Sequence, residues 1–197
     1  LTSGNDITDS GTVTVGAWFI ATTDANNGNI NMNSFAGQAI HLNTHGTGNA
    51  TVVNDTQLVF GNTHMTIGGD LSVTATTGQI TDSFNHNGSV TVAGTSSFTT
   101  SQNNADIILD DTDHVFTGAV ALNTTGSSGH ATIDNGTTAF IVAQSSVGGN
   151  LTLTSGHASG ITDSGTVTVG GNLTATTDAN SGVINLGTLA IDGTVAL

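Results

Sequence analysis

Apolar and polar residues alternate along most of this chain, in short runs separated by glycine, asparagine and aspartate. Val167 and Val169 share one face of an extended segment, and Leu173 and Ala175 resume the apolar series after the turn at 170–172. An apolar residue at every second position is typical of a β-strand with one buried face. The runs are too short for helices, and no helical periodicity is present. The pattern predicts an all-β chain of short strands joined by tight turns.

The alternating pattern also returns at long intervals. Residues 7–16 recur without change at 161–170, and a looser copy occupies 80–92. The turn glycine of these copies recurs at an even spacing, at Gly11, Gly88 and Gly165. Self-similarity at a fixed period is the mark of a repeat architecture, in which each unit buries its apolar face against its neighbours.

We therefore expect one parallel β-helix over residues 1–197, made of units at about 1–79, 80–160 and a partial unit at 161–197. A unit of this length divides into about four coils of about 19–20 residues, so the chain would hold roughly ten coils. Valine, leucine, isoleucine and alanine would fill a continuous axial core, with threonine, serine and asparagine outside.

Composition narrows the range of partners. The 197 residues include no lysine, arginine, glutamate, proline, cysteine or tyrosine, and aspartate alone gives the formal charge of −14. Neutralising nucleic-acid phosphate or an anionic lipid surface requires cationic side chains, so we exclude both partners. No apolar run is long enough for a membrane-spanning helix, which needs about 18 residues or more. Because cysteine is absent, the redox compartment cannot be inferred from thiols.

The segment 161–176 resembles the repeats of filamentous-haemagglutinin-like proteins, the large exoproteins of two-partner secretion systems. Segments 105–111 and 116–120 also resemble the units of giant bacterial surface proteins of this kind. The resemblance covers essentially the whole chain and implies a right-handed parallel β-helix shaft at the bacterial cell surface. The secretion domain of that family has no counterpart here, so the route of export is only implied.

From these observations we expect a structural protein and not an enzyme. It would be the rigid spacer of a secreted filament or adhesin that serves attachment or contact with cells or matrix. The chain opens within a repeat, at Leu1-Thr2-Ser3, so we expect it to be part of a longer array. The partners would be the continuation of that array, other copies in a filament, and a cell-surface or matrix glycan.

Two other functions stay open. β-Helices also carry polysaccharide-acting enzymes, and paired carboxylates such as Asp110 with Asp113 could serve hydrolysis. However, Asp9, Asp82 and Asp163 recur with the repeat, and an acid copied into every unit is better explained as structural. A flat lattice of threonine pairs could instead bind ice. Such pairs occur about once per long unit, which disfavours a continuous lattice.

Three aspartates in the densest acidic cluster are candidate Ca²⁺ ligands. Asp110, Asp111 and Asp113 lie within one short segment, and Ca²⁺ prefers several carboxylate and carbonyl oxygens. An acidic turn at a coil corner explains the same residues. No other cofactor is expected.

Histidines and possible glycosylation sites are scattered along the chain. The histidines are better explained as surface or stacked residues than as metal ligands, at His41, His45, His64, His86, His114, His130 and His157. Asn-x-Ser/Thr sequences are candidate glycosylation sites, at Asn49, Asn54, Asn87, Asn123, Asn135, Asn150 and Asn172. Asparagine in turns explains each of them more simply.

Trp18-Phe19-Ile20 interrupts the repeat, because the later copy has Asn172-Leu173-Thr174 at the same place. Alternation puts Phe19 inside and directs Trp18 and Ile20 outward. Two interpretations follow: an exposed aromatic patch for a glycan or a neighbouring filament, or a rearranged or covered coil in which these side chains fill the core. The second is slightly favoured.

Overall fold

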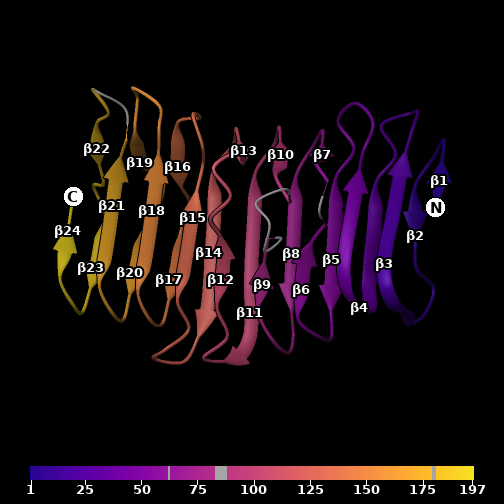
Figure 1. The fold of residues 1–197 in the computed structure, drawn as a ribbon, viewed down its shortest axis with the longest axis horizontal. Coiled ribbons are helices and arrows are strands. Elements are labelled where there is room, and N and C mark those ends of the chain that lie inside the picture. Colours follow the sequence, from indigo (N-terminus) through magenta and orange to yellow (C-terminus); the bar gives the residue numbers. More distant parts are fainter. Residues whose placement is uncertain (62, 83–87, 179–180) are drawn as a thin grey trace.

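Short strands follow one another along the whole length of a rod, with the two chain ends at opposite ends (Figure 1). The structure is a computed structural model that describes residues 1–61, 63–82, 88–178 and 181–197. Every strand pairing in the described part is parallel, as in Ile133 opposite Leu153, and no described residue is helical. No described segment could therefore cross a membrane as a helix. The predicted all-β parallel solenoid is confirmed.

From β5 onward each coil contributes three strands, one to each of three stacks. Within β5–β24 a strand pairs with the third strand before and after it, except that β16 pairs with the start of β14 and not with β13. The first stack is β5 (Ala50–Asn54), β8 (Leu71–Ala75), β11 (Ser96–Asn103), β14 (Val120–Thr125), β17 (Ser145–Val147), β20 (Val167–Val169) and β23 (Leu189–Ile191). The second is β6 (Leu58–Phe60), β9 (Ile80–Thr81), β12 (Ile107–Leu109), β15 (Ala131–Asp134), β18 (Leu151–Ser155), β21 (Leu173–Thr177) and β24 (Val195–Ala196).

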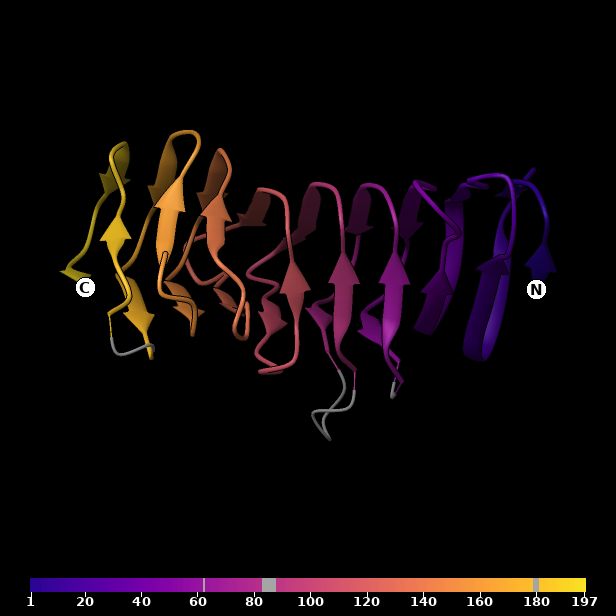
Figure 2. The ribbon, with the colours of Figure 1, turned by 90° about the horizontal axis from the view of Figure 1, so that it is seen from above.

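The third stack has two parts, because no pairing joins β13 to β16. Its members are β7 (Met65–Ile67), β10 (Val90–Val92), β13 (Val115–Phe116), β16 (Phe140–Val142), β19 (Ile161–Asp163) and β22 (Ile184–Asn185). Figure 2 shows the coils from above, following one another from the N-terminal to the C-terminal end.

At the N-terminal end neighbouring strands run together into longer ones. The first four strands are β1 (Thr2–Ser3), β2 (Ile7–Thr8), β3 (Val13–Thr23) and β4 (Ile30–Asn43). Both β3 and β4 bend at a shift in register, so each supplies more than one side of its coil.

Coils are on the whole longer than the sequence predicted, as the numbering of strand partners in adjacent coils shows. Ile30 pairs with Ala50, which matches the predicted coil length. Leu151 pairs with Leu173 and Leu71 with Ser96, and both of these coils are longer. The rod consequently has about eight turns, against the roughly ten predicted from shorter coils.

The sequence repeat does not equal a whole number of coils. Equivalent strands are ten apart: β9 and β19 both begin Ile-Thr, and β10 and β20 both read Val-Thr-Val. Three strands make one coil, so ten strands make three coils and one further side. Each repeat is therefore rotated by a third of a turn from the one before it. Equivalent surface residues in successive repeats face different directions.

Inward residues form one continuous core from end to end. All six phenylalanines in the described part are buried in it. The rings of Phe60, Phe98 and Phe116 follow one another in edge-to-face contacts, with centroids 6.0 and 5.6 Å apart. Such contacts stabilise neighbouring coils beyond simple burial. The core thus ties each coil to the next, as expected for a solenoid.

Candidate functional site

The aspartates that recur with the repeat perform one structural task. A carboxylate oxygen accepts the backbone N–H of a residue in the next coil: Ser34 to Asp9 at 2.6 Å, Asp111 to Asp82 at 2.8 Å and Gly187 to Asp163 at 2.7 Å. The Gly187 N–H holds the pKa of Asp163 below its ordinary value, because it stabilises the ionised form. These contacts join adjacent coils and give the three acids a structural role.

Asp82 is also part of a buried pair with His114. His114 Nε2 lies 3.2 Å from Asp82 Oδ2, and both side chains are buried. The N–H of Val90 donates to His114 Nδ1 at 3.0 Å, so the ring proton of the neutral histidine is on Nε2 and points to Asp82. Sequence reasoning missed this pair, because the two residues are far apart in the chain and only the coil register brings them together.

The predicted Ca²⁺ ligands do not point to one place. Asp111 is buried, whereas Asp110 and Asp113 are exposed. One oxygen of Asp111 accepts the N–H of Asp113 at 2.9 Å, and the other has no hydrogen-bond partner among the described residues. In the described ranges no three acidic or histidine side chains are grouped so that they could hold a metal ion. Calcium binding here stays a prediction.

Two of the predicted glycosylation sites are occupied by internal hydrogen bonds. Asn54 and Asn135 are both fully buried. The amide of Asn54 bonds both the N–H and the C=O of Gly37, and that of Asn135 bonds both groups of Phe116. Because these amides lie inside the fold, the folded chain has no room for a sugar at either one.

The other predicted glycosylation sites differ in exposure. Asn49, Asn150 and Asn172 are exposed at turns, and each accepts the backbone N–H of the corresponding residue in the next coil. Asn123 is half-buried, and Asn87 lies outside the described residues. Glycosylation at these positions stays a prediction.

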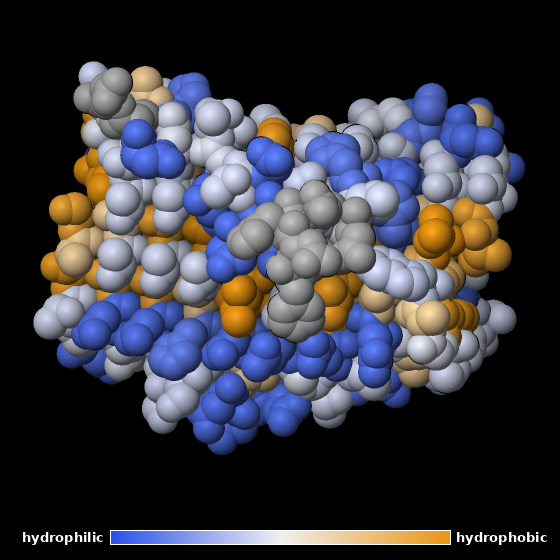
Figure 3. Space-filling view, in the orientation of Figure 1, coloured by the Kyte–Doolittle hydropathy of each residue, from blue (hydrophilic) through white to orange (hydrophobic). Residues whose placement is uncertain are grey.

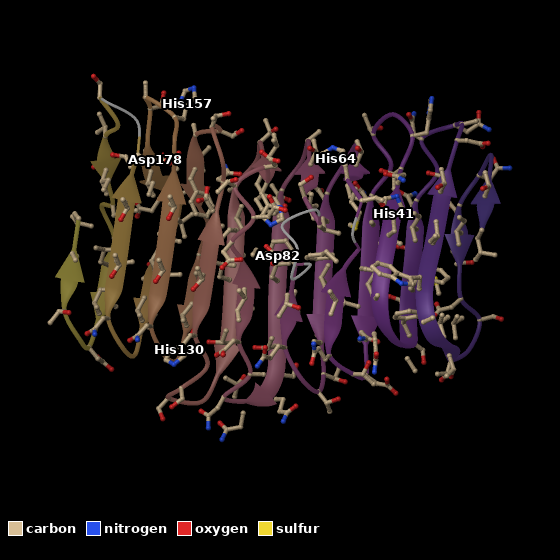
Figure 4. The ribbon with its side chains drawn as sticks, viewed as in Figure 1. His41, His64, Asp82, His130, His157 and Asp178 are labelled. Carbon is tan, nitrogen blue, oxygen red and sulfur yellow. The ribbon has the colours of Figure 1, made fainter. Side chains whose placement is uncertain are left out.

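Histidine side chains in the described part are spread along the rod, and all except that of His45 form hydrogen bonds with nearby groups (Figure 4). His130 accepts the N–H of Asn150 at 2.8 Å, His157 that of Ser159 at 3.0 Å, and His64 contacts the hydroxyl of Ser89 at 2.9 Å. His86 lies outside the described residues. These contacts fit the structural interpretation.

Threonine pairs stack over only a short part of the rod. Thr152 and Thr154 on β18 lie beside Thr174 and Thr176 on β21, and one column extends to Thr132. On β20, Thr168 lies between Ser146 and Ala190 instead. The described pairings thus contain a double threonine column of two coils and no longer lattice.

Trp18 and Ile20 are exposed, by 45 % and 54 %, while Phe19 is buried. The alternation in the sequence correctly predicted these orientations. The interpretation in which Trp18 and Ile20 fill the core is wrong, because both are exposed and no described segment covers them. Both residues project from β3 beside β4, and the space-filling view has an apolar patch there, near the N-terminal end (Figure 3).

Trp18, Ile20, His41 and Thr63 line a shallow hollow of about 290 Å³. The indole extends over Gly61, where a Cβ atom would lie 2.7 Å from the ring. The glycine therefore makes room for the tryptophan. We call these four lining residues the Trp18 hollow.

The polar side of the Trp18 hollow is held in one arrangement. Thr66 donates its N–H to Asn43 Oδ1 at 2.9 Å, which fixes the orientation of that amide. The amide nitrogen of Asn43 then donates to His41 Nε2 at 2.8 Å. The ring proton must therefore be on Nδ1, which lies 2.8 Å from the hydroxyl oxygen of Thr63. The Thr63 hydroxyl accepts this proton and keeps its own hydrogen for another partner.

Comparison with protein families finds two matches to the repeats described as repeats of unknown function (DUF5649), at residues 47–123 and 128–197. The chain belongs to this family. The buried Asn54 and Asn135 lie equally far from the start of the first and the second DUF5649 match, so they are equivalent residues of two repeats. No curated protein and no solved structure matches the chain.

Proposed function

We propose that this DUF5649 chain is a shaft segment of a secreted, surface-displayed fibrous protein, related in role to the filamentous-haemagglutinin-like exoproteins that it resembles. The observation that supports this most is the continuous core and ladder of pairings from β1 to β24, with no separate folded unit along the described chain. A rod of this construction separates what lies at its two ends, and its mechanism is mechanical and not catalytic.

Two further properties support the proposal, the first for a location outside the cell and the second for a structural role. The absence of lysine and arginine removes every cleavage site for trypsin-like proteases. The buried acids Asp82 and Asp111 both bind backbone N–H groups, as the acid of a structural turn does.

The last coil presents apolar residues that a further coil would cover. Ile184, Leu186, Leu189 and Ile191 are only partly buried against the core, and Val195 is exposed. Either the continuation of a repeat array or the end of another copy would bury these side chains and pair the open strand edge. We propose continuation of the array as the main arrangement.

Immunogold electron microscopy of intact cells that produce the protein, labelled with an antibody to this chain, tests the proposal. The expected result is gold on thin filaments that extend beyond the cell surface, without permeabilisation. Labelling that appears only after the cells are opened would overturn it. A matched strain that lacks the coding sequence supplies the background.

A further inference from the structure

The Trp18 hollow departs from the repeat at every position that forms its apolar part. The register of β3 with β4 matches that of β11 with β14, so Trp18 corresponds to Thr95, Ile20 to Ser97 and His41 to Ala121. In the third repeat the counterparts of Trp18 and Ile20 are Asn172, directly before β21, and Thr174 within it.

Gly61 departs in the same way. The N–H of Gly61 bonds Ile40 O at 2.8 Å, and the N–H of Ala143 bonds the equivalent Val120 O at the same distance. Alanine at this place would collide with the indole. A shaft needs none of these changes, since the second repeat folds without any of them and the third without those at Trp18 and Ile20. These residue changes all occur at one point on the surface, which indicates that this point has a function of its own.

We infer that the Trp18 hollow is a binding site for the ring of a neutral sugar. One face of a pyranose ring carries C–H groups, which fit against the electron-rich face of an indole. Ile20 extends the apolar surface, and the free hydrogen of the Thr63 hydroxyl can donate to a sugar hydroxyl at the ring edge. A hollow of about 290 Å³ is at the small end for ligand sites, which suits one ring of a longer glycan.

Anionic and cationic ligands can also stack on tryptophan, but the charge of the chain disfavours the first and the lining of the hollow disfavours the second. The chain has a formal charge of −14 and no lysine or arginine, so an anionic sugar, nucleotide or lipid headgroup would be repelled. A cationic ligand would be attracted to the indole face. However, the four lining residues include no carboxylate, and the Thr63 group that faces the ligand is a donor.

Trp18 is the only tryptophan in the chain, so intrinsic fluorescence reports on this site alone. We would titrate the whole chain with neutral hexose oligosaccharides, each to about 10 mM, where a site with a Kd of about 1 mM is about nine-tenths filled. The expected result is a saturable change in fluorescence with at least one of them. Thr63→Val should weaken that binding about fivefold, because it removes the donor and leaves the indole in place.

Trp18→Asn, which installs the residue of the third repeat, should weaken binding at least about tenfold in saturation-transfer NMR. Ser97→Ala, at the place equivalent to Ile20 in the second repeat, should leave affinity unchanged. Circular dichroism confirms that each variant is folded.

Three outcomes would overturn the inference. The first is no response to any neutral oligosaccharide, and the second is tighter binding of a choline-type cation or a uronic acid polymer. The third is a fluorescence change that follows protein concentration, which would indicate that a second copy of the chain occupies the hollow. Sugar binding by the hollow does not depend on where the shaft is displayed. A negative titration would therefore leave the proposed function untouched, and the immunogold result does not test sugar binding.

Discussion

Buried asparagines hold the corners of this solenoid through several hydrogen bonds at once. The Asn54 side chain bonds Gly37 N–H and C=O as well as the carbonyls of Thr56 and Gln57. Asn135 makes the same kind of set with Phe116, Thr138 and Ala139. One side chain thus satisfies backbone groups from two coils that no ladder reaches.

Asn54→Ala should lower the free energy of unfolding by about 2–3 kcal/mol, because buried backbone groups lose their partner. The exposed Asn49 accepts one bond from Asp70, and water can replace it. Asn49→Ala should therefore cost no more than about 1 kcal/mol. Urea unfolding of both variants beside the parent chain measures the difference. Equal effects would contradict the role given to the buried amide.

Burial lowers the pKa of His41 below its ordinary value of 6.5; a backbone hydrogen bond with Thr63 offsets part of this effect, and the nearby His64 adds a smaller lowering. The other polar groups that face the ring are Asn43 and Thr63. The unfolded chain therefore takes up a proton at higher pH than the folded chain does. The contribution of His41 to stability is complete above pH 6.5 and is lost as the pH falls through the lowered pKa.

Thermal unfolding between pH 7.5 and pH 5 should accordingly show a steeper loss of stability in the parent chain than in His41→Ala. The aspartates titrate alike in both proteins, so the difference isolates the imidazole. Parallel pH profiles for the two proteins would refute this assignment.

At the scale of the element, turn glycines allow coils to approach closely. A Cβ on Gly148 would collide with the carbonyl oxygen of Gly126 in the coil before, whereas a Cβ on Gly16 would meet nothing. Each glycine directly follows a valine at the end of a short alternating segment, Val15 before Gly16 and Val147 before Gly148, so sequence alone does not separate them. The difference arises from the packing of one turn on the next.

Gly148→Ala should destabilise the chain by about 1–3 kcal/mol, because backbone on both sides of the turn must shift. Gly16→Ala is the matched control and should change stability by less than about 0.5 kcal/mol. Chemical unfolding measures both. A neutral Gly148→Ala would mean that the turns are more loosely stacked than described.

The alternation predicted the strands and their inward residues, as at Val167 and Val169, and the repeat predicted that the strands are parallel. Coil length did not follow from the sequence, because the repeat is not a whole number of coils: its ten strands fill three coils and one further side. The Asp82–His114 pair required the true register. The recurrence of Asp9, Asp82 and Asp163 was the signal available, and it identified a structural acid without naming its partner.

On the scale of the whole molecule, 14 aspartates repel one another along the rod, with no lysine or arginine to offset them. Raising NaCl from about 0.01 to about 0.15 M shortens the screening length from about 30 to about 8 Å and should raise the unfolding midpoint. At matched ionic strength, screening alone predicts equal midpoints in Mg²⁺ and Ca²⁺. A rise specific to Ca²⁺ that Asp111→Asn removes would instead support the predicted calcium site at Asp110, Asp111 and Asp113.

Each repeat is rotated by a third of a turn from the one before it, so a surface feature present in every repeat would appear on all three sides of a long shaft. The Trp18 hollow, in contrast, occurs once here and faces one direction. The described coil register therefore underlies every structural feature, from the ladders to the hollow.

Disulfide trapping tests that register most directly, because the chain has no cysteine of its own. Thr152 and Thr174 are partners in adjacent coils and lie on the outer surface. Neighbouring parallel strands are about 4.8 Å apart, within the range of about 4.4–6.8 Å between Cα atoms that a disulfide spans. We predict rapid, nearly complete crosslinking of Thr152→Cys/Thr174→Cys under mild oxidation, and little in Thr152→Cys/Asn172→Cys. Preferential crosslinking of the second pair would imply a shorter coil at this point, with Asn172 beside Thr152, and would contradict the structure.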